Sequence, residues 1–409
     1  MVIMIPSLLY LDRYRNEGTR TYSEHAGYTE AHEKYRPYSK HPQFELAVFE
    51  VPRDEMLVYT ANPYRELETV YLAADAGKIL FCIHPQILEE HRDDPYVNRT
   101  LSIGTPREGI VVSPSSSTRT LYVLDDTAPH AIKVHFPFRI SRYGRKLREE
   151  VLAQAINISL ELEEGIRHLD DRFAFLREVI GVSHKNLQPE SARGENWGYL
   201  VRDMTPFPIA DDHRHLIPGF SLYGRDFFDP GKPLLLFDLI GDRDPVKFVL
   251  ENIMFPIIRH WVDCFQHFGY LLEPHGQNVL LDVGKDREIK RIVHRDLGLG
   301  IDMNRRRELH LPDGNLTAYN RMESNEFHSI TYDKFMGGHF FDRILASCLE
   351  RYPDLKEEDF CKPCRDAFAR IFPDYAKYLP KTIQYFSEER DQFGKPLFQD
   401  TGITPKWRP

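Results

Sequence analysis

The chain has 409 residues, of which 42% are hydrophobic and 28% are charged, a composition ordinary for a water-soluble globular protein of two or three packed lobes. The net charge of −9 argues against a general nucleic-acid binder, and no run approaches the ~20 apolar residues that a membrane span needs. An odd number of cysteines without dense spacing predicts a reducing, cytoplasmic location. They are Cys82, Cys264, Cys348, Cys361 and Cys364.

The first hundred residues carry few chemical signals. The apolar stretch at residues 1–10 is too short for a signal peptide, because Asp12 and Arg13 end it. Residues 43–82 predict strands with one helix, and the strand-like runs are FELAVFEV at 44–51 and KILFCI at 78–83.

A cluster of possible anion-binding groups follows. Residues 115–120 offer hydroxyls, among them Ser117 and Thr120, and Arg119 offers a planar set of donors suited to phosphate or carboxylate. Lys133 lies in a predicted strand whose alternation indicates one polar and one buried face. A lysine on such a strand commonly neutralises a nucleotide phosphate. Further cations follow at Arg139, Arg142, Arg145 and Lys146.

The middle of the chain predicts helices and loops. Apolar residues at helical spacing, from Leu147 to Leu162, predict a helix over 144–180. The turn-rich residues 216–233 predict a surface loop between lobes, and Asp211–His215 predicts a polar loop rather than a metal site. Residues 245–269 predict a long helix that Pro256 kinks and Gly269 ends.

The most informative stretch begins at residue 273 and reads EPHGQNVLLDV. Glu273, His275, Gln277 and Asn278 precede a predicted hairpin formed by residues 279–283 and 289–293, and Asp296 follows the hairpin. Kinase-like folds hold Mg²⁺ on a nucleotide triphosphate with an Asn before one strand and an Asp after the next. Asn and Asp supply the oxygen ligands that a hard cation prefers.

The remaining residues, 320–409, predict a mainly helical region. Its aromatic core is expected from Tyr319, Tyr332, Phe335, Phe340 and Phe341. Cys361 and Cys364 form a lone CxxC with no second pair, so a structural pair is a better interpretation than zinc.

Taken in order, these motifs resemble the IucA/IucC family, the siderophore synthetases that work independently of nonribosomal peptide synthetases (NIS synthetases). The matching elements are Ser117-Thr118-Arg119-Thr120, Lys133, Ile140-Ser141, Arg145, Glu273-Pro274-His275-Gly276-Gln277-Asn278 and Arg295-Asp296. Two elements depart from the family: Arg142 stands where it has a serine, and only Lys34 and Arg36 remain of its N-terminal Lys-x-Arg element.

The resemblance implies an α+β, multi-lobed fold with a kinase-like palm, made of an antiparallel sheet plus helices, and a mainly helical C-terminal region. The expected lobes are residues 1–160, with the phosphate-binding elements, and residues 161–409, with the palm.

It also implies an ATP- and Mg²⁺-dependent ligase that adenylates a carboxylic acid, citrate or a related polycarboxylate, for capture by an amine, hydroxylamine or alcohol. The partners would be these small molecules, with no nucleic acid or membrane, and a homodimer is compatible with the resemblance. By resemblance, ATP would be held by Ser117, Arg119, Thr120, Lys133, Glu273, Gln277 and Asn278; the metal by Asn278 and Asp296; and the acid by Arg145 and His275. Catalysis would fall to His275, Arg145 and Lys133.

Two alternatives from other classes stay open. A small-molecule phosphotransferase of kinase-like fold would need a catalytic Asp five residues before Asn278, where this chain has Glu273, and a Gly-rich loop before Lys133, which is absent from the sequence. A nucleotide-binding pseudoenzyme would not need the metal ligands.

Overall fold

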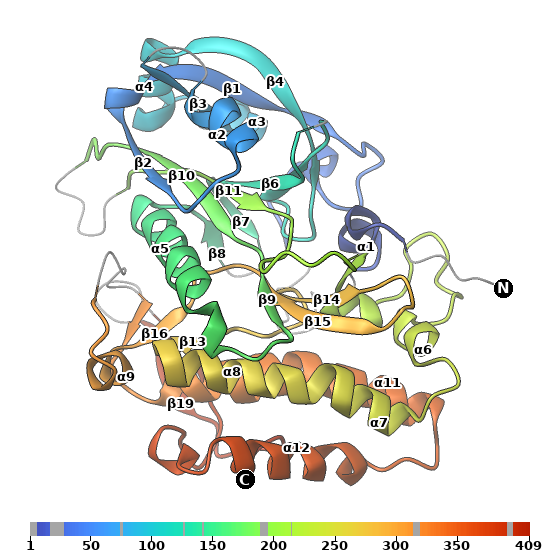
Figure 1. The fold of residues 1–409 in the computed structure, drawn as a ribbon. Coiled ribbons are helices and arrows are strands. Elements are labelled where there is room, and N and C mark those ends of the chain that lie inside the picture. Colours follow the sequence, from blue (N-terminus) through green and yellow to red (C-terminus); the bar gives the residue numbers. More distant parts are fainter. Residues whose placement is uncertain are drawn as a thin grey trace.

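The computed structural model describes residues 6–16, 28–73, 77–125, 127–140, 143–188, 195–213, 215–313, 320–390 and 396–409. A large sheet with short helices forms one end of the molecule, a smaller sheet lies in the middle, and long helices form the other end (Figure 1). The predicted α+β class is confirmed. Within the described ranges, no helix is long and apolar enough to cross a membrane. Four residues that the sequence singles out lie outside the described ranges: Ser141, Arg142, Arg214 and Tyr319.

The large sheet has eight antiparallel strands in the order β2-β10-β11-β6-β5-β4-β1-β3. Two of them, β10 and β11, come from beyond residue 160. The large sheet therefore contains strands from both sides of the predicted lobe boundary, and the division into lobes at residue 160 stays a prediction. The strands are β1 Phe44–Pro52, β2 Met56–Thr60, β3 Lys78–Ile83, β4 Thr105–Pro114, β5 Thr120–Val123, β6 His130–Val134, β10 Glu178–His184 and β11 Gly198–Asp203.

Helices cover both faces of this sheet. The short helices α2 (Arg65–Leu72), α3 (Pro85–Glu90) and α4 (Pro95–Ile103) share a core with inward residues such as Val182 and Tyr199. Helix α5 (Glu149–Gly165) packs against the opposite face, where Leu152 approaches Gly181. Every residue of β6 is buried, and the predicted polar face, which carries Lys133, is turned towards Asp296 and other charged groups rather than towards solvent.

The predicted helix over 144–180 is correct only for α5. It ends at Gly165, where the ring of Phe268 packs so closely that a Cβ would collide with it. The chain then forms β9 (Phe173–Phe175) and β10. Because every residue of β10 is buried, its apolar residues run continuously and give no alternation that would separate a strand from a helix.

The middle layer is a four-stranded sheet in the order β12-β14-β15-β9. Strands β14 (Val279–Val283) and β15 (Ile289–His294) form the predicted hairpin, with Val279 opposite His294. The edge strand of this sheet is β12 (His215–Pro218), which pairs with β14. Two smaller sheets are formed by β7 (Phe136–Ile140) with β8 (Tyr143–Arg145), and by β13 (Tyr270–Leu271), β16 (Gly300–Asp302) and β17 (Arg321–Met322).

Residues 245–268 form the predicted helical path with one interruption. Helix α7 (Pro245–Val249) passes through a π-turn (Leu250–Met254) into α8 (Phe255–Phe268). Pro256, which lacks an N–H, falls at the start of α8 directly after the π-turn. Gly269 ends α8 in the left-handed conformation, with φ of 68°, as its position predicted.

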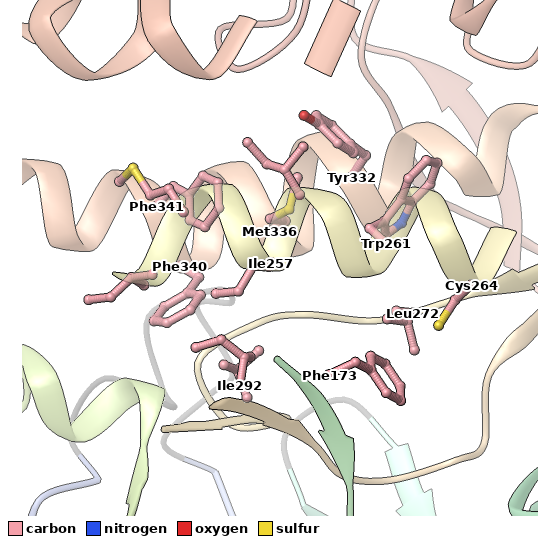
Figure 2. Packing of buried hydrophobic residues seen from close by; sticks show 14 of the residues in the cluster. Phe173, Ile257, Trp261, Cys264, Leu272, Ile292, Tyr332, Met336, Phe340 and Phe341 are labelled. Carbon is pink, nitrogen blue, oxygen red and sulfur yellow. The ribbon is translucent and has the colours of Figure 1, made fainter. Parts of the chain in front are cut away.

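The C-terminal region is mainly helical, as predicted, and the structure adds a closing hairpin. Figure 2 shows Ile257 and Trp261 of α8 against Tyr332, Met336 and Phe340, all buried, from a π-helical segment, η8. Cys361 and Cys364 are free and buried on α12, as expected of a structural pair. The elements are α9 Met303–Glu308, α10 Glu326–Ser329, η8 Ile330–Phe341, α11 Asp342–Arg351, α12 Glu357–Ile371, β18 Gln384–Arg390 and β19 Pro396–Asp400.

Residues 216–233 only partly form the predicted surface loop. Phe227 and Phe228 are exposed, but residues 216–218 of β12, which pairs with β14 in the middle sheet, and the 3₁₀ turn Gly219–Leu222 are buried. The remaining helical elements are short: α1 Leu8–Tyr14, α6 Leu235–Ile240, and 3₁₀ turns at Glu33–Tyr35, Arg53–Glu55, Ile166–His168 and Tyr375–Lys377.

Candidate active site

The β14–β15 hairpin brings Asn278 and Asp296 to one end of the middle sheet. The carbonyl of Asn278, just before β14, accepts a hydrogen bond of 2.9 Å from the backbone N–H of Arg295, just after β15. Asp296 follows with a φ of 72°, a left-handed conformation that only glycine adopts without cost, although Asp tolerates it better than most residues. Strained backbone of this kind is concentrated at functional sites.

The segment Glu273–Asn278 forms a tight turn that packs against the buried 3₁₀ turn Gly219–Leu222. The backbone N–H groups of His275 and Asn278 donate to the carbonyls of Glu273 and His275, both at 2.9 Å. The carbonyl of Gly276 accepts from Phe220 at 2.9 Å. A Cβ at Gly276 would collide with the Tyr223 hydroxyl, so only glycine allows this approach.

The central contact of the site is an ion pair across the two sheets. Lys133 Nζ lies 2.6 Å from Asp296 Oδ1, and Arg202 lies 4.0 Å from the same oxygen. Lys133 is buried, whereas the side chain of Asp296 is 38% exposed. Burial alone would raise the pKa of Asp296, but Lys133, Arg202 and Arg119 hold it well below its usual value. Burial lowers the pKa of Lys133, against the opposing effect of Asp296.

The turn between β4 and β5 carries the hydroxyl and arginine elements. Thr120 lies opposite Lys133 in the sheet, and the Ser117 hydroxyl accepts from the Thr120 N–H at 3.1 Å. Thr118 has a φ of 67°, which is rare for a β-branched residue. Arg119 donates to the carbonyl of Arg145 at 2.8 Å. Burial, followed by the charge of Arg145, lowers the pKa of Arg119 to about 10.

Glu273 and His275 are both driven towards their neutral forms. Burial, with the nearby charge of Asp296, raises the pKa of Glu273 to about 8. Burial lowers the pKa of His275 to about 4, and the cations Arg295 and Arg145 lower it further against the effect of Asp296. The ring of Phe335 packs edge-on against His275 at 5.6 Å. At neutral pH the site thus offers a protonated carboxyl group and a neutral imidazole next to a cluster of cations.

Arg119, Lys133, Glu273 and His275 therefore lie within electrostatic reach of Asp296, where the large sheet faces the hairpin, and Arg145 lies within reach of Arg119 and His275. Gln277 joins them through its backbone: its N–H contacts His275 Nδ1 at 3.3 Å, and its carbonyl accepts from Arg295 Nε at 2.7 Å. The other cations noted from the sequence are engaged away from Asp296. Lys146 pairs with Glu195, Lys34 with Glu89, and Arg36 bonds the Ala31 carbonyl.

Several residues of the site were missed from the sequence. Arg202 Nε donates to Glu178 at 2.8 Å on neighbouring strands, but the predicted helix over 144–180 included Glu178 at the start of β10. Asp12 binds Arg295 from helix α1, with 283 positions between them in the chain. No local pattern could have signalled either pairing.

The oxygen donors of Asn278 and Asp296 fit a hard cation such as Mg²⁺, since half-exposed Asp296 still faces solvent and a phosphate could complete the ligands. Within the described ranges, this site included, no group of three or more His, Cys, Asp or Glu side chains could hold a metal ion. His213 of the predicted polar loop is paired with Asp282 instead.

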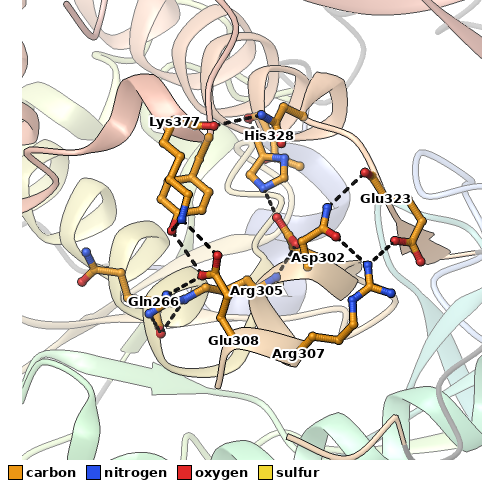
Figure 3. Close-up of polar contacts among 12 residues, drawn as sticks. Gln266, Asp302, Arg305, Arg307, Glu308, Glu323, His328 and Lys377 are labelled. Atoms are coloured by element: carbon orange, nitrogen blue, oxygen red, sulfur yellow. Dashed lines mark hydrogen bonds and ion pairs between the residues drawn. The ribbon is translucent and has the colours of Figure 1, made fainter. Parts of the chain in front are cut away.

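A second polar network fixes the chain directly after Asp296. Figure 3 shows Asp302, which ends β16, accepting from His328 Nε2 at 2.6 Å and capping α9 through the Arg305 N–H at 2.7 Å. Arg305 also bonds the Gln266 carbonyl at the end of α8, and Glu308 pairs with Lys377 at 3.0 Å. The loop that carries Asp296 is therefore anchored to the helical layer.

The comparisons with known proteins agree with this geometry. Residues 25–224 match the model of the IucA / IucC family, just under half of the chain. No curated protein matches the chain by sequence.

Among solved structures, the petrobactin biosynthesis protein AsbB from Bacillus anthracis superposes with a TM-score of 0.70 at 15% identity, covering 95% of this chain and 72% of AsbB. The aerobactin synthetase IucC from Klebsiella pneumoniae gives 0.65 at 15%, covering 86% of this chain and 66% of IucC. ATP-bound aerobactin synthetase IucA from the same species gives 0.65 at 16%, covering 85% and 66%. The fold is that of the NIS synthetases, and this chain spans about two thirds to three quarters of their length.

Proposed function

We propose that this protein is an ATP-dependent ligase that activates a carboxylic acid as its acyl-adenylate and passes the acyl group to an amine, hydroxylamine or alcohol. The observation that carries the proposal is the Lys133–Asp296 pair at 2.6 Å, with Asn278 at the same end of the hairpin. That arrangement sits in a fold whose relative IucA binds ATP.

The chemistry follows from the charges. In the first half-reaction a substrate carboxylate oxygen attacks the α-phosphorus of ATP, and the bond to pyrophosphate breaks. Negative charge grows on the phosphoryl oxygens and the leaving group, and preorganised cations stabilise it. Arg119, Lys133 and Arg202 supply that charge from rigid strands or a tight turn.

Asn278 and Asp296 would hold Mg²⁺, which, when bound, neutralises phosphate charge. In this structure the ammonium group of Lys133 is paired with the carboxylate of Asp296. Nucleotide binding would move that ammonium group from the carboxylate to a phosphate. Glu273, protonated at neutral pH, can donate a hydrogen bond to an anionic oxygen without adding negative charge.

Arg145 and His275 are proposed for the acid. An arginine grips a carboxylate with two parallel hydrogen bonds, and Arg145 lies next to Arg119 and within electrostatic reach of His275. In the second half-reaction the nucleophile attacks the acyl carbon and AMP leaves. His275 is neutral at pH 7 and can orient the nucleophile by a hydrogen bond, while the proton that the nucleophile loses passes to solvent.

Citrate or a related polycarboxylate is the proposed acid, because several cations converge on one site. The test is acid-dependent exchange of labelled pyrophosphate into ATP, with citrate and other di- and tricarboxylates as probes. Exchange that requires one of these acids supports the proposal. Transfer of the γ-phosphate to a hydroxyl compound, without exchange, would favour the phosphotransferase alternative. Kinase-like phosphotransferases also place an Asn and an Asp at the two ends of such a hairpin.

A further inference from the structure

A buried carboxylate on helix α1 joins the two halves of the candidate site. Asp12 is fully buried and accepts from three side chains in two stretches of the chain. Arg295 donates to it twice, from Nη1 at 2.8 Å and from Nη2 at 3.1 Å. The Ser116 hydroxyl donates at 2.8 Å, and the Tyr122 hydroxyl forms a short hydrogen bond to the other oxygen.

On the side of the β14–β15 hairpin, Asp12 acts through Arg295. The same guanidinium donates from Nε to the carbonyl of Gln277 at 2.7 Å, while the backbone N–H of Arg295 bonds the Asn278 carbonyl. Asp296 is the next residue, in its left-handed conformation. The orientation of Arg295 is thus coupled to both proposed metal ligands.

On the sheet side, Asp12 acts through Ser116 and Tyr122. Ser116 lies in the turn directly before Ser117, Thr118 and Arg119, and Tyr122 lies on β5 two residues beyond Thr120. Ser116 belongs to the turn proposed to bind phosphate, and Tyr122 lies on the strand that continues from it.

Helix α1 is itself held by both halves, so it can transmit this restraint. Arg13 donates to the Ser113 hydroxyl of β4 at 2.5 Å, and the Ser221 hydroxyl below the palm donates to the Arg15 carbonyl at 3.1 Å. Figure 1 shows α1 between the large sheet and the β14–β15 hairpin.

We propose that Asp12 is a positioning residue that sets the distance and orientation between the phosphate-binding turn, residues 115–120, and the metal-binding hairpin. The inference rests on the proposed function, in which both the turn and the hairpin bind the nucleotide. It assigns a role to α1, which none of the sequence motifs described above includes. Without the carboxylate, Arg295 would be a buried cation without its partner, and the turn and hairpin would lose their common anchor.

The test is the affinity for ATP, measured by calorimetry with Mg²⁺, in the full chain and in Asp12→Asn. The matched control is Asp282→Asn, since Asp282 is equally buried and bound by Arg291 at 2.6 and 2.9 Å, on the same hairpin but towards its other end. Displacing reacting groups by about 1 Å costs about 100-fold in rate, so we expect Asp12→Asn to weaken ATP binding at least about tenfold and to slow exchange further. We expect Asp282→Asn to stay within about twofold in affinity at a comparable loss of melting temperature.

The proposal is overturned if Asp12→Asn binds ATP as wild type does, or if both variants weaken binding equally. Should Asp12→Asn not fold, Ser116→Ala and Tyr122→Phe remove one donor each, and each is expected to weaken ATP binding about two- to fivefold. Unchanged affinity in both variants would equally overturn it. A wild-type protein that does not bind ATP would instead contradict the proposed function, so the two failures are distinguishable.

Discussion

Replacing Asp296 by asparagine should abolish turnover while leaving the fold intact. The change removes the one carboxylate among the proposed metal ligands and the partner of Lys133. A metal ion contributes several kcal/mol of transition-state stabilisation, and a loss of about 4 kcal/mol corresponds to about 10³ in rate.

The expected cost in stability is much smaller. Removing one partner of a fully buried ion pair costs about 3–5 kcal/mol, but Asp296 is 38% exposed, so about 1–2 kcal/mol is the appropriate figure. The low pKa of Asp296 means that its contribution is present above the usual carboxyl range and disappears only as the pH falls through the depressed folded-state value.

The assay is acid-dependent ATP–pyrophosphate exchange across a Mg²⁺ titration, with the melting temperature measured in parallel. Asp286→Asn is the control, because Asp286 forms a Lys–Asp pair of the same 2.6 Å length with Lys290 at the exposed tip of the same hairpin. The control should exchange as wild type does. Exchange by Asp296→Asn within about threefold of wild type at ordinary Mg²⁺ would refute the metal assignment.

Three further predictions concern the acid site, the turn and the pH dependence. Arg145→Lys should lose nearly as much acid-dependent exchange as Arg145→Ala, since lysine offers only a point charge, whereas exposed Arg139→Ala should be tolerated; normal exchange by Arg145→Lys would place the acid elsewhere. Gly276→Ala should cost about 1–3 kcal/mol in urea unfolding and weaken ATP binding, because its Cβ would lie 2.9 Å from the Phe220 nitrogen; wild-type stability would contradict the turn geometry. Because the pKa of Glu273 rises from 4.5 to about 8 on folding, the nucleotide-free protein should lose stability as the pH rises through that window, and Glu273→Gln should remove this component; identical pH profiles of the two melting temperatures would show that Glu273 is not buried as described.

Local motifs were sufficient to predict the hairpin and the meeting of the segments at its open end. Asn278 and Asp296 flank two short apolar strands, so their meeting follows from hairpin geometry alone. Lys133 could be recognised as a strand lysine, but its pairing with Asp296, 163 positions away, could not be derived from spacing. The order of motifs shared with the IucA/IucC family assigned Lys133 to the nucleotide and Asp296 to the metal, and did not predict their ion pair.

Other features depend on tertiary packing and were inaccessible to the sequence. Gly165 ends α5 because the Phe268 ring occupies the space of a side chain, a contact between segments about a hundred residues apart. Residues 216–222 have turn-forming composition, yet they are buried because the Glu273–Asn278 turn packs on them. Asp12 is an ordinary-looking helix residue whose importance appears only when Arg295, Ser116 and Tyr122 are seen around it.

The central claim is that this site cleaves ATP between its α- and β-phosphates. The most direct measurement is product analysis after turnover with ATP labelled at the α- or the γ-phosphate, in the presence of citrate or another polycarboxylate and an amine. The account predicts label in AMP from the α-position and in pyrophosphate from the γ-position, with formation of an amide or ester. Labelled ADP from the α-position, together with a phosphorylated product carrying the γ-label, would contradict it and identify a phosphotransferase.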